Sequence, residues 1–579
     1  MIRPAVGAMK GSTTVWPLIL ALAGMIGFHL ASIRQPLSQE ELTWWFQLPQ
    51  SLLATGRPLS IHGTTWSDDP PLYALLLAGV FAGFGVGEVQ ARALGLVLGL
   101  LTMVTFYTTV CILQMRHAPE VPFAQLALSL YVLHPLVLQS TLLVEVDTTL
   151  GPLAAGLFAL YAVRLEKLGA RREAAFGGLL VAFLLWIKFY DAFLLVAALV
   201  LVVTLNEGWR AALRRVGRVV ALGLAFFVLT WLPVSHALSM DTTGPLAYAF
   251  DALRRRSLGV PLARAVSWPR ETAEAALWMS PVLMVVAPLV ALAWLRVGHR
   301  RPQFLGVQLI AVWGVAQLVV PLLLIGPLYG FPKYQAPALV LLLPAVTLYA
   351  TMRRDAPLGS LWQALAVGAG SGVLLYPLVG DVLLQARVHL KAVALEQPER
   401  IWQVAGVLVL SVVAYLVLPA AVLCCWPGVR RRTRSLVVPA LLAAHTSCMA
   451  GLITAQTRDG YLTRYAYGER GVREVANLIR REAASGVVVA PLPVTHYAGT
   501  SPLPSVSAFW DLGGATVLPA VRDPGTRCLV YSLGHNSLAQ LRYLEHDRTL
   551  ARALRDHGFA KRTIGTFTVW CRPGPSAAR

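Results

Sequence analysis

The chain reads Glu40-Glu41-Leu42-Thr43-Trp44-Trp45 shortly after its first hydrophobic segment, residues 13–33. It continues with Asp68-Asp69-Pro70-Pro71-Leu72-Tyr73, and Arg92 opens the next long hydrophobic segment. Four carboxylates and several aromatic rings therefore lie where a membrane protein usually has a short and bland loop. Charged groups beside a bilayer are costly and tend to mark functional sites, so this stretch predicts a site at one membrane face.

The composition excludes a soluble globular protein. Of the 579 residues, 56% are hydrophobic and 13% are charged, whereas about a quarter of the residues are charged in typical soluble chains. The sequence therefore predicts an α-helical polytopic membrane protein. Basic loops between spans, which set topology, explain the net charge of +20. These loops lack the interleaved aromatic residues of single-strand binders, so no nucleic acid partner is expected.

Hydropathy predicts about thirteen transmembrane helices. This number treats Leu72–Phe84 as a juxtamembrane helix on the outer face, because it is short for a full crossing. Alternate loops are then basic and face the cytoplasm together with the N-terminus, while most acidic loops face outward. The outward loop at about 237–275 is an exception, since it carries Arg254-Arg255-Arg256. These arginines either clamp a phosphate or anchor the loop to the bilayer surface, and the anchor is favoured.

An odd number of spans places the C-terminus outside the cytoplasm. We therefore predict a transmembrane domain over residues 1–455, with an outer catalytic loop at 34–90, and an extracytoplasmic α/β domain over residues 456–579. In the latter, helical spacing at Gly471–Ala484 and Leu541–His557 accompanies three short runs typical of strands. These runs cover residues 486–490, 528–531 and 566–571.

Cys528 and Cys571 lie on two of the predicted strands. If this domain lies outside the cytoplasm, its compartment permits a disulfide between them. Two buried free thiols are the alternative, and the residues do not decide between the two.

Glu40 and Glu41 are the first candidates for chemistry. Adjacent carboxylates on a water-facing loop could act as a general base or position a metal, and a solvated loop charge or helix N-terminus is the alternative. Trp44 and Trp45 follow them. The two rings either belong to the aromatic belt at the membrane interface or stack on a sugar or polyprenyl chain.

Asp68 and Asp69 precede a predicted helix whose entry is set by Pro70-Pro71. A helix dipole favours negative charge at this end, so capping is the alternative to substrate binding by these aspartates. Arg92 begins the next span at the same face. Its guanidinium could pair with the carboxylates or with a phosphate.

Glu145 and Asp147 lie between two predicted spans on the outer side. Asp147 could join Glu40 or Glu41 around a divalent cation such as Mg or Mn, for which oxygen ligands are suited. Glu41 and Asp147 are therefore the predicted metal ligands.

Two lysines lie at outer corners of the predicted bundle. Lys188 could hold a lipid-linked phosphate or pair with Asp191 in the headgroup region. Lys333, followed by Tyr334, lies on the same face. The sequence contains no Walker A loop, Rossmann fingerprint or HExxH motif, so it gives no sign of nucleotide-driven chemistry. A sugar donor used outside the cytoplasm would be lipid-linked, because nucleotide sugars are not available there.

In their order and spacing, these elements resemble the GT-C membrane glycosyltransferases. The likeness is to the bacterial branch that contains the aminoarabinose transferase of lipid A and to the protein O-mannosyltransferases. The segments that carry it are Glu40-Glu41, Asp69-Pro70-Pro71-Leu72-Tyr73, Ala91-Arg92-Ala93-Leu94, Asp147, Ile187-Lys188-Phe189 and Lys333-Tyr334-Gln335-Ala336-Pro337. Three positions depart from the family pattern: Glu40 replaces aspartate, Asp69 replaces histidine and Lys333 replaces arginine.

The resemblance implies transfer of a sugar from a polyprenyl-phosphate donor to a lipid, glycan or protein acceptor at the outer face of the bacterial inner membrane. Glu40 or Glu41 would act as base with help from Asp147, while Arg92, Lys188 and Lys333 would neutralise the leaving lipid phosphate. The remaining expected substrate contacts are Asp68, Asp69, Tyr73, Tyr334, Trp44 and Trp45. Two alternatives stay open: a transporter or flippase for lipid-linked glycans, and a non-catalytic assembly subunit.

Overall fold

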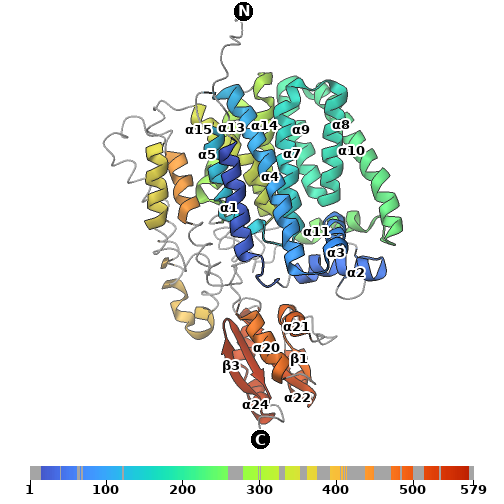
Figure 1. Cartoon of the computed structure of the whole chain (residues 1–579), viewed down its shortest axis with the longest axis vertical. Coiled ribbons are helices and arrows are strands. Elements are labelled where there is room, and N and C mark those ends of the chain that lie inside the picture. Colours follow the sequence, from blue (N-terminus) through green and yellow to red (C-terminus); the bar gives the residue numbers. More distant parts are fainter. Residues whose placement is uncertain are drawn as a thin grey trace, which may run out of the picture.

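The computed structural model describes residues 15–38, 41–60, 65–66, 70–119, 123–257, 278–297, 299, 301–324, 333–352, 362–374, 392–403, 406–407, 410, 413, 437–448, 471–482, 486–499, 514–533, 536 and 538–572. Its larger part is a bundle of long helices, and a small module with a β-sheet lies at one end of that bundle (Figure 1).

Six described helices are long and apolar enough to cross a membrane. They are α4 (Glu88–His117), α7 (Val146–Arg164), α9 (Phe189–Glu207), α10 (Trp209–Ala237), α14 (Leu305–Leu324) and α15 (Ala336–Met352). Beside them lie α1 (Trp16–Ser32), α5 (Phe123–Val132), α8 (Ala170–Ile187) and α13 (Pro281–Val297). The predicted spans near 359–384, 401–426 and 435–455 lie partly or mostly outside the described residues, so the number of spans stays a prediction.

Small residues let the helices approach closely, as membrane bundles require. A Cβ added to Gly178 of α8 would lie 2.8 Å from Leu222, and one added to Gly223 of α10 would lie 2.7 Å from Val181. A Cβ at Gly95 of α4 would meet the carbonyl oxygen of Thr141 at 2.6 Å. These contacts fix α8 against α10 and seat the segment after α6 on α4.

The predicted juxtamembrane helix has the predicted bounds: α3 covers Leu72–Phe84. Its 13 residues span about 20 Å at 1.5 Å each, less than the roughly 30 Å of a hydrocarbon core. With α2 (Gln47–Thr55) it lies at the lower end of the bundle in Figure 1, next to the sheet module, rather than along the bundle's length.

One predicted transmembrane helix is wrong, because the structure interrupts it. The described part of the predicted span at 121–141 contains two helices, α5 and α6 (Pro135–Ser140), instead of one. The residue before a proline avoids the helical region, and His134 is extended with ψ 130°. Its ring nitrogen accepts a hydrogen bond from the backbone N–H of Leu136 at 3.2 Å and so caps α6. The predicted loop at 237–275 also contains a helix, α11 (Gly244–Ser257).

The sheet module has four strands in the order β1-β2-β4-β3. β1 (Val487–Val489) runs parallel to β2 (Thr526–Ser532), and the pairs of β4 (Phe567–Cys571) with β2 and with β3 (Ala560–Ile564) are antiparallel. The three predicted strands are confirmed. β3 was missed because its side chains are mostly exposed and lack the alternation of a half-buried strand.

Among the described residues of this module, five helices accompany the sheet: α20 (Val472–Glu482), α21 (Leu492–Ala498), α22 (Gly514–Arg522), α23 (Leu538–His546) and α24 (Arg548–Asp556). The predicted helix over Leu541–His557 is split, because Asp547 caps a new helix by accepting the N–H of Leu550 at 2.8 Å. Side chains alternate across β2: Cys528 and Val530 pack on one face of the sheet, whereas Leu529 and Tyr531 pack on the other.

Cys528 and Cys571 form a disulfide with an S–S distance of 2.01 Å. They lie directly opposite each other on β2 and β4. The predicted bridge is therefore confirmed, and the alternative of two free thiols is wrong.

Candidate active site

Glu41 opens a π-helical turn, Glu41–Phe46, and its side chain is fully buried. One carboxylate oxygen accepts the backbone N–H of Ser38 at 2.6 Å, and the other accepts that of Val144 at 2.9 Å. The hydroxyl of Ser38 in turn accepts the N–H of Glu41 at 3.3 Å. Glu41 thus joins the segment after α1 to the segment before α7.

Arg92 lies beside this carboxylate, with Nη1 3.6 Å from Oε1 of Glu41, and it is fully buried. Its guanidinium donates to three backbone carbonyls: Leu142, Gln35 at 3.0 Å and Pro36 at 3.2 Å. A buried arginine with this set of acceptors holds two loops in place. The sequence predicted that Arg92 would pair with Asp68 and Asp69 or with a phosphate, whereas the structure places it beside Glu41. The two aspartates lie outside the described residues, so their pairing stays a prediction.

Two lysine–carboxylate pairs involve the residues that follow Val144, namely Glu145 and Asp147 at the start of α7. Lys188, between α8 and α9, donates to both oxygens of Asp147 at 2.5 and 2.6 Å. Lys333 donates to Glu145 at 2.5 Å across a separation of 188 residues. All four side chains are nearly or fully buried, and charges so placed are tolerated only when paired.

Tyr334 connects the two pairs. The Nζ of Lys188 lies 4.4 Å from the centroid of its ring, and that of Lys333 lies 5.1 Å from it. The Tyr190 ring meets it edge-on at 6.3 Å. The carboxylate that the sequence offered as an alternative partner of Lys188, Asp191, instead accepts from Gln317 at 2.8 Å.

The aromatic residues of the acidic stretch form a chain. Trp44 is 37% exposed and its ring lies 5.4 Å from that of Trp66. Trp66 is followed by Trp45 at 6.3 Å, and Trp45 by the buried Tyr73 at 5.6 Å. These rings lead from the surface to the interior.

The structure thus brings together most of the predicted site residues: Glu41, Arg92, Asp147, Lys188, Lys333, Tyr334, Tyr73, Trp44 and Trp45. Glu40, Asp68 and Asp69 lie outside the described residues. The pairing of Glu145 with Lys333 was missed, and no local signal reveals it because the partners are distant in sequence.

The predicted metal ligands do not fit a divalent cation as the described residues are arranged. Both oxygens of Asp147 accept from an ammonium group, and Glu41 accepts two backbone N–H groups beside a guanidinium. Within the part of the chain that the structure describes, no three His, Cys, Asp or Glu side chains gather in a way that could hold a metal ion. No step is therefore assigned to a metal.

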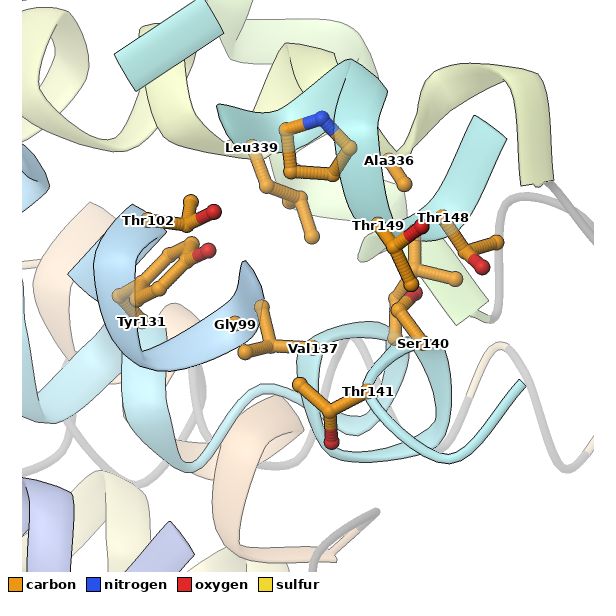
Figure 2. Close-up of a pocket in the computed structure, with 12 residues that line it drawn as sticks. Gly99, Thr102, Tyr131, Val137, Ser140, Thr141, Thr148, Thr149, Ala336 and Leu339 are labelled. Carbon is orange, nitrogen blue, oxygen red and sulfur yellow. The ribbon is translucent and has the colours of Figure 1, made fainter. Parts of the chain in front are cut away.

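A small cavity lies between α4, α5, α6, α7 and α15 (Figure 2). Its volume of about 20 Å³ suits about one water molecule and is too small for a sugar ring. Hydroxyl side chains surround it: Thr102, Tyr131, Ser140, Thr141, Thr148 and Thr149. The Ser140 and Thr148 hydroxyls have no hydrogen-bond partner among the described residues, so a bridging water is their natural partner.

The sheet module docks on the same end of the bundle. The Tyr497 hydroxyl accepts the backbone N–H of Leu37 at 2.7 Å. Arg473 donates to Glu88 at 2.9 Å and to the carbonyl of Arg34 at 3.0 Å. These contacts hold the segment whose carbonyls bind Arg92, and sequence reasoning did not find them.

His496 completes this contact. Its ring lies edge-on 5.9 Å from that of Phe46. Burial lowers the pKa of His496 below its ordinary value, so the ring packs there in its neutral form at pH 7.

Comparison with solved structures identifies the fold. The chain is similar to a crystal structure of ArnT from Cupriavidus metallidurans bound to undecaprenyl phosphate, with a TM-score of 0.53, 16% identity, and coverage of 96% of this chain and 98% of the other. The apo structure of that protein gives a TM-score of 0.52 at 15% identity, with the same coverage. No family model and no curated protein matches.

The likeness extends over nearly the whole chain and confirms the predicted fold class. The chain therefore has the fold of the ArnT structure, the GT-C-type fold, in which a bundle of long apolar helices carries a small α/β module at one end.

Proposed function

We propose that this protein is a membrane glycosyltransferase that moves a sugar from a polyprenyl-phosphate donor to an acceptor at the outer face of the bacterial inner membrane. The observation that carries the proposal is the pair of buried lysines, Lys188 and Lys333, whose ammonium groups both lie close to the ring of Tyr334. The likeness to a fold that binds undecaprenyl phosphate in ArnT supports a lipid-linked donor.

The two lysines supply positive charge where the phosphate would leave. As the bond between the anomeric carbon and the phosphate oxygen breaks, negative charge grows on that oxygen, and preorganised ammonium groups stabilise it. Asp147 and Glu145 hold the lysines in place beforehand. The leaving group is the polyprenyl phosphate.

The acceptor hydroxyl must lose a proton as its oxygen bonds to the anomeric carbon. Glu41 is buried against two backbone N–H groups and Arg92, which suits a positioning residue. Its neighbour Glu40 is the remaining member of the acidic pair, and we assign the general base to it. The chain of rings that begins at Trp44 would offer a surface for the acceptor or the lipid.

The orientation follows the sequence prediction, with a cytoplasmic N-terminus and an extracytoplasmic sheet module. The disulfide is compatible with this, because such bonds persist in oxidising compartments. The acceptor class, whether lipid, glycan or protein, is left to experiment.

The test uses purified protein in lipid nanodiscs with a panel of radiolabelled polyprenyl-phosphate sugars. Wild type should release polyprenyl phosphate, and Glu40→Gln should abolish release while its unfolding temperature stays unchanged. Lys333→Met should lower turnover about 100- to 1000-fold, as for the loss of one preorganised donor. Donor binding without turnover by the wild type on every acceptor tried would favour a transporter or an assembly subunit instead.

A further inference from the structure

A second group of cations lies at the opposite end of the α8–α9 pair. α8 has 18 residues and ends beside Lys188, and α9 returns over 19 residues to Glu207. At 1.5 Å per residue each helix spans about 27 Å, close to the thickness of a hydrocarbon core. The start of α8, the end of α9 and the start of α10 therefore meet one bilayer thickness from the candidate active site.

An open cavity of about 300 Å³ lies between these three ends. Three arginines, two glutamates and three alanines line it. Arg215 donates to both Glu173 and Glu207, so one arginine serves both carboxylates. Arg214 and Arg218 have no carboxylate partner among the described residues.

The two remaining arginines lie on one face of α10. Residues four apart on a helix are neighbours, and like charges there repel each other. The Nε of Arg214 donates to the carbonyl of Arg210 at 3.3 Å, and the Nη groups of its guanidinium make no ion pair with a described carboxylate. An anion between Arg214 and Arg218 would relieve the repulsion, while Glu173 and Glu207 on the far wall are already bound by Arg215.

The surroundings favour a lipid over a free anion. Trp209 and Leu213 of α10 are each about 60% exposed, and Phe176 of α8 is 53% exposed. The guanidinium of Arg210 lies 5.7 Å from the centroid of the Trp209 ring. Exposed apolar rings beside cations are typical of the membrane–water interface.

We propose that this cavity binds the phosphate of an anionic phospholipid from the leaflet opposite the candidate active site. Arg214 and Arg218 hold the phosphate, and the acyl chains lie along the exposed apolar side chains of α8 and α10. Basic pockets between the ends of transmembrane helices bind such headgroups elsewhere. The site does not depend on the proposed transferase activity, since no residue is shared.

The experiment compares lipid retention by the whole protein. Wild type and the double variant Arg214→Gln with Arg218→Gln are equilibrated with mixed phosphatidylglycerol and phosphatidylcholine vesicles, extracted gently, and analysed by native mass spectrometry. Two lost phosphate contacts should weaken phosphatidylglycerol retention about 30-fold, whereas phosphatidylcholine is unaffected. The matched control is Arg296→Gln with Arg301→Gln, which removes the same charge from exposed positions near the same end.

An equal loss in the control would overturn the proposal, because general surface charge would then explain retention. Inorganic phosphate supplies the second arm. If millimolar phosphate protects the cavity arginines from chemical modification while phosphatidylglycerol vesicles do not, the site takes a free anion and the lipid assignment is wrong. Selective protection by phosphatidylglycerol supports the proposal.

Discussion

The charged side chains at the two ends of the α8–α9 pair differ in burial and in ion pairing. At one end Lys188 is buried and bound by both oxygens of Asp147. At the other, Arg214 and Arg218 are exposed and have no carboxylate partner among the described residues. A buried charge must be paired and is therefore fixed in position, whereas an exposed one stays available to a ligand. The first arrangement suits catalysis and the second suits binding.

The largest difference should appear on removing one arginine from the candidate active site and one from the cavity at the opposite end of the bundle. Arg92→Gln leaves Glu41 buried without its cation and frees three carbonyls, so we expect a loss of about 3–5 kcal/mol of stability. Arg214→Gln removes a charge from an exposed position and should leave stability within measurement error. Thermal unfolding in detergent measures both. Equal shifts in the unfolding temperature would contradict the expectation that the buried arginine contributes more to stability than the exposed one.

The lysine pairs allow a sharper test by double-mutant cycles. Asp147→Asn with Lys188→Met, and Glu145→Gln with Lys333→Met, should each show a coupling of about 1–3 kcal/mol in unfolding. The crossed combination, Asp147→Asn with Lys333→Met, should couple more weakly. Equally strong crossed coupling would show one shared network around Tyr334 rather than two pairs.

A smaller effect is expected where the sheet module touches the site. Tyr497→Phe removes the acceptor of the Leu37 N–H, at a cost of about 1 kcal/mol, and loosens the segment that holds Arg92. Amide hydrogen exchange at residues 34–38 should quicken, and turnover should fall about fivefold, as that free energy implies. Tyr543→Phe, which packs within the module, is the control and should change neither.

The smallest effect should come from the arginine cavity in the absence of lipid. The double variant Arg214→Gln with Arg218→Gln should unfold at the wild-type temperature in neutral detergent. Added phosphatidylglycerol should raise the unfolding temperature of the wild type only, because a ligand stabilises only the form that binds it. A rise of the same size in the variant would show that phosphatidylglycerol stabilises the protein without binding at Arg214 and Arg218.

Much of the local structure could be predicted from sequence because it depends on short-range patterns. The bounds of α3 follow from Pro70-Pro71 before it and the glycines after it. Three strands of the sheet module follow from runs of β-branched and aromatic residues. The break at His134 was missed although Pro135 was present, since the surrounding hydropathy was that of one continuous span.

By itself the sequence determined that the fold is a bundle of apolar helices with a small α/β module, and it predicted the residues of a candidate site at one end of that bundle. Only the tertiary structure decided the partners: Lys188 with Asp147, Lys333 with Glu145, Glu41 with Arg92, and Cys528 with Cys571. Hydropathy and turn signals act over a few residues, whereas these contacts join residues 41 to 188 positions apart. Such pairs are set by how the helices and strands pack, because burial forces each charge to find a partner within reach.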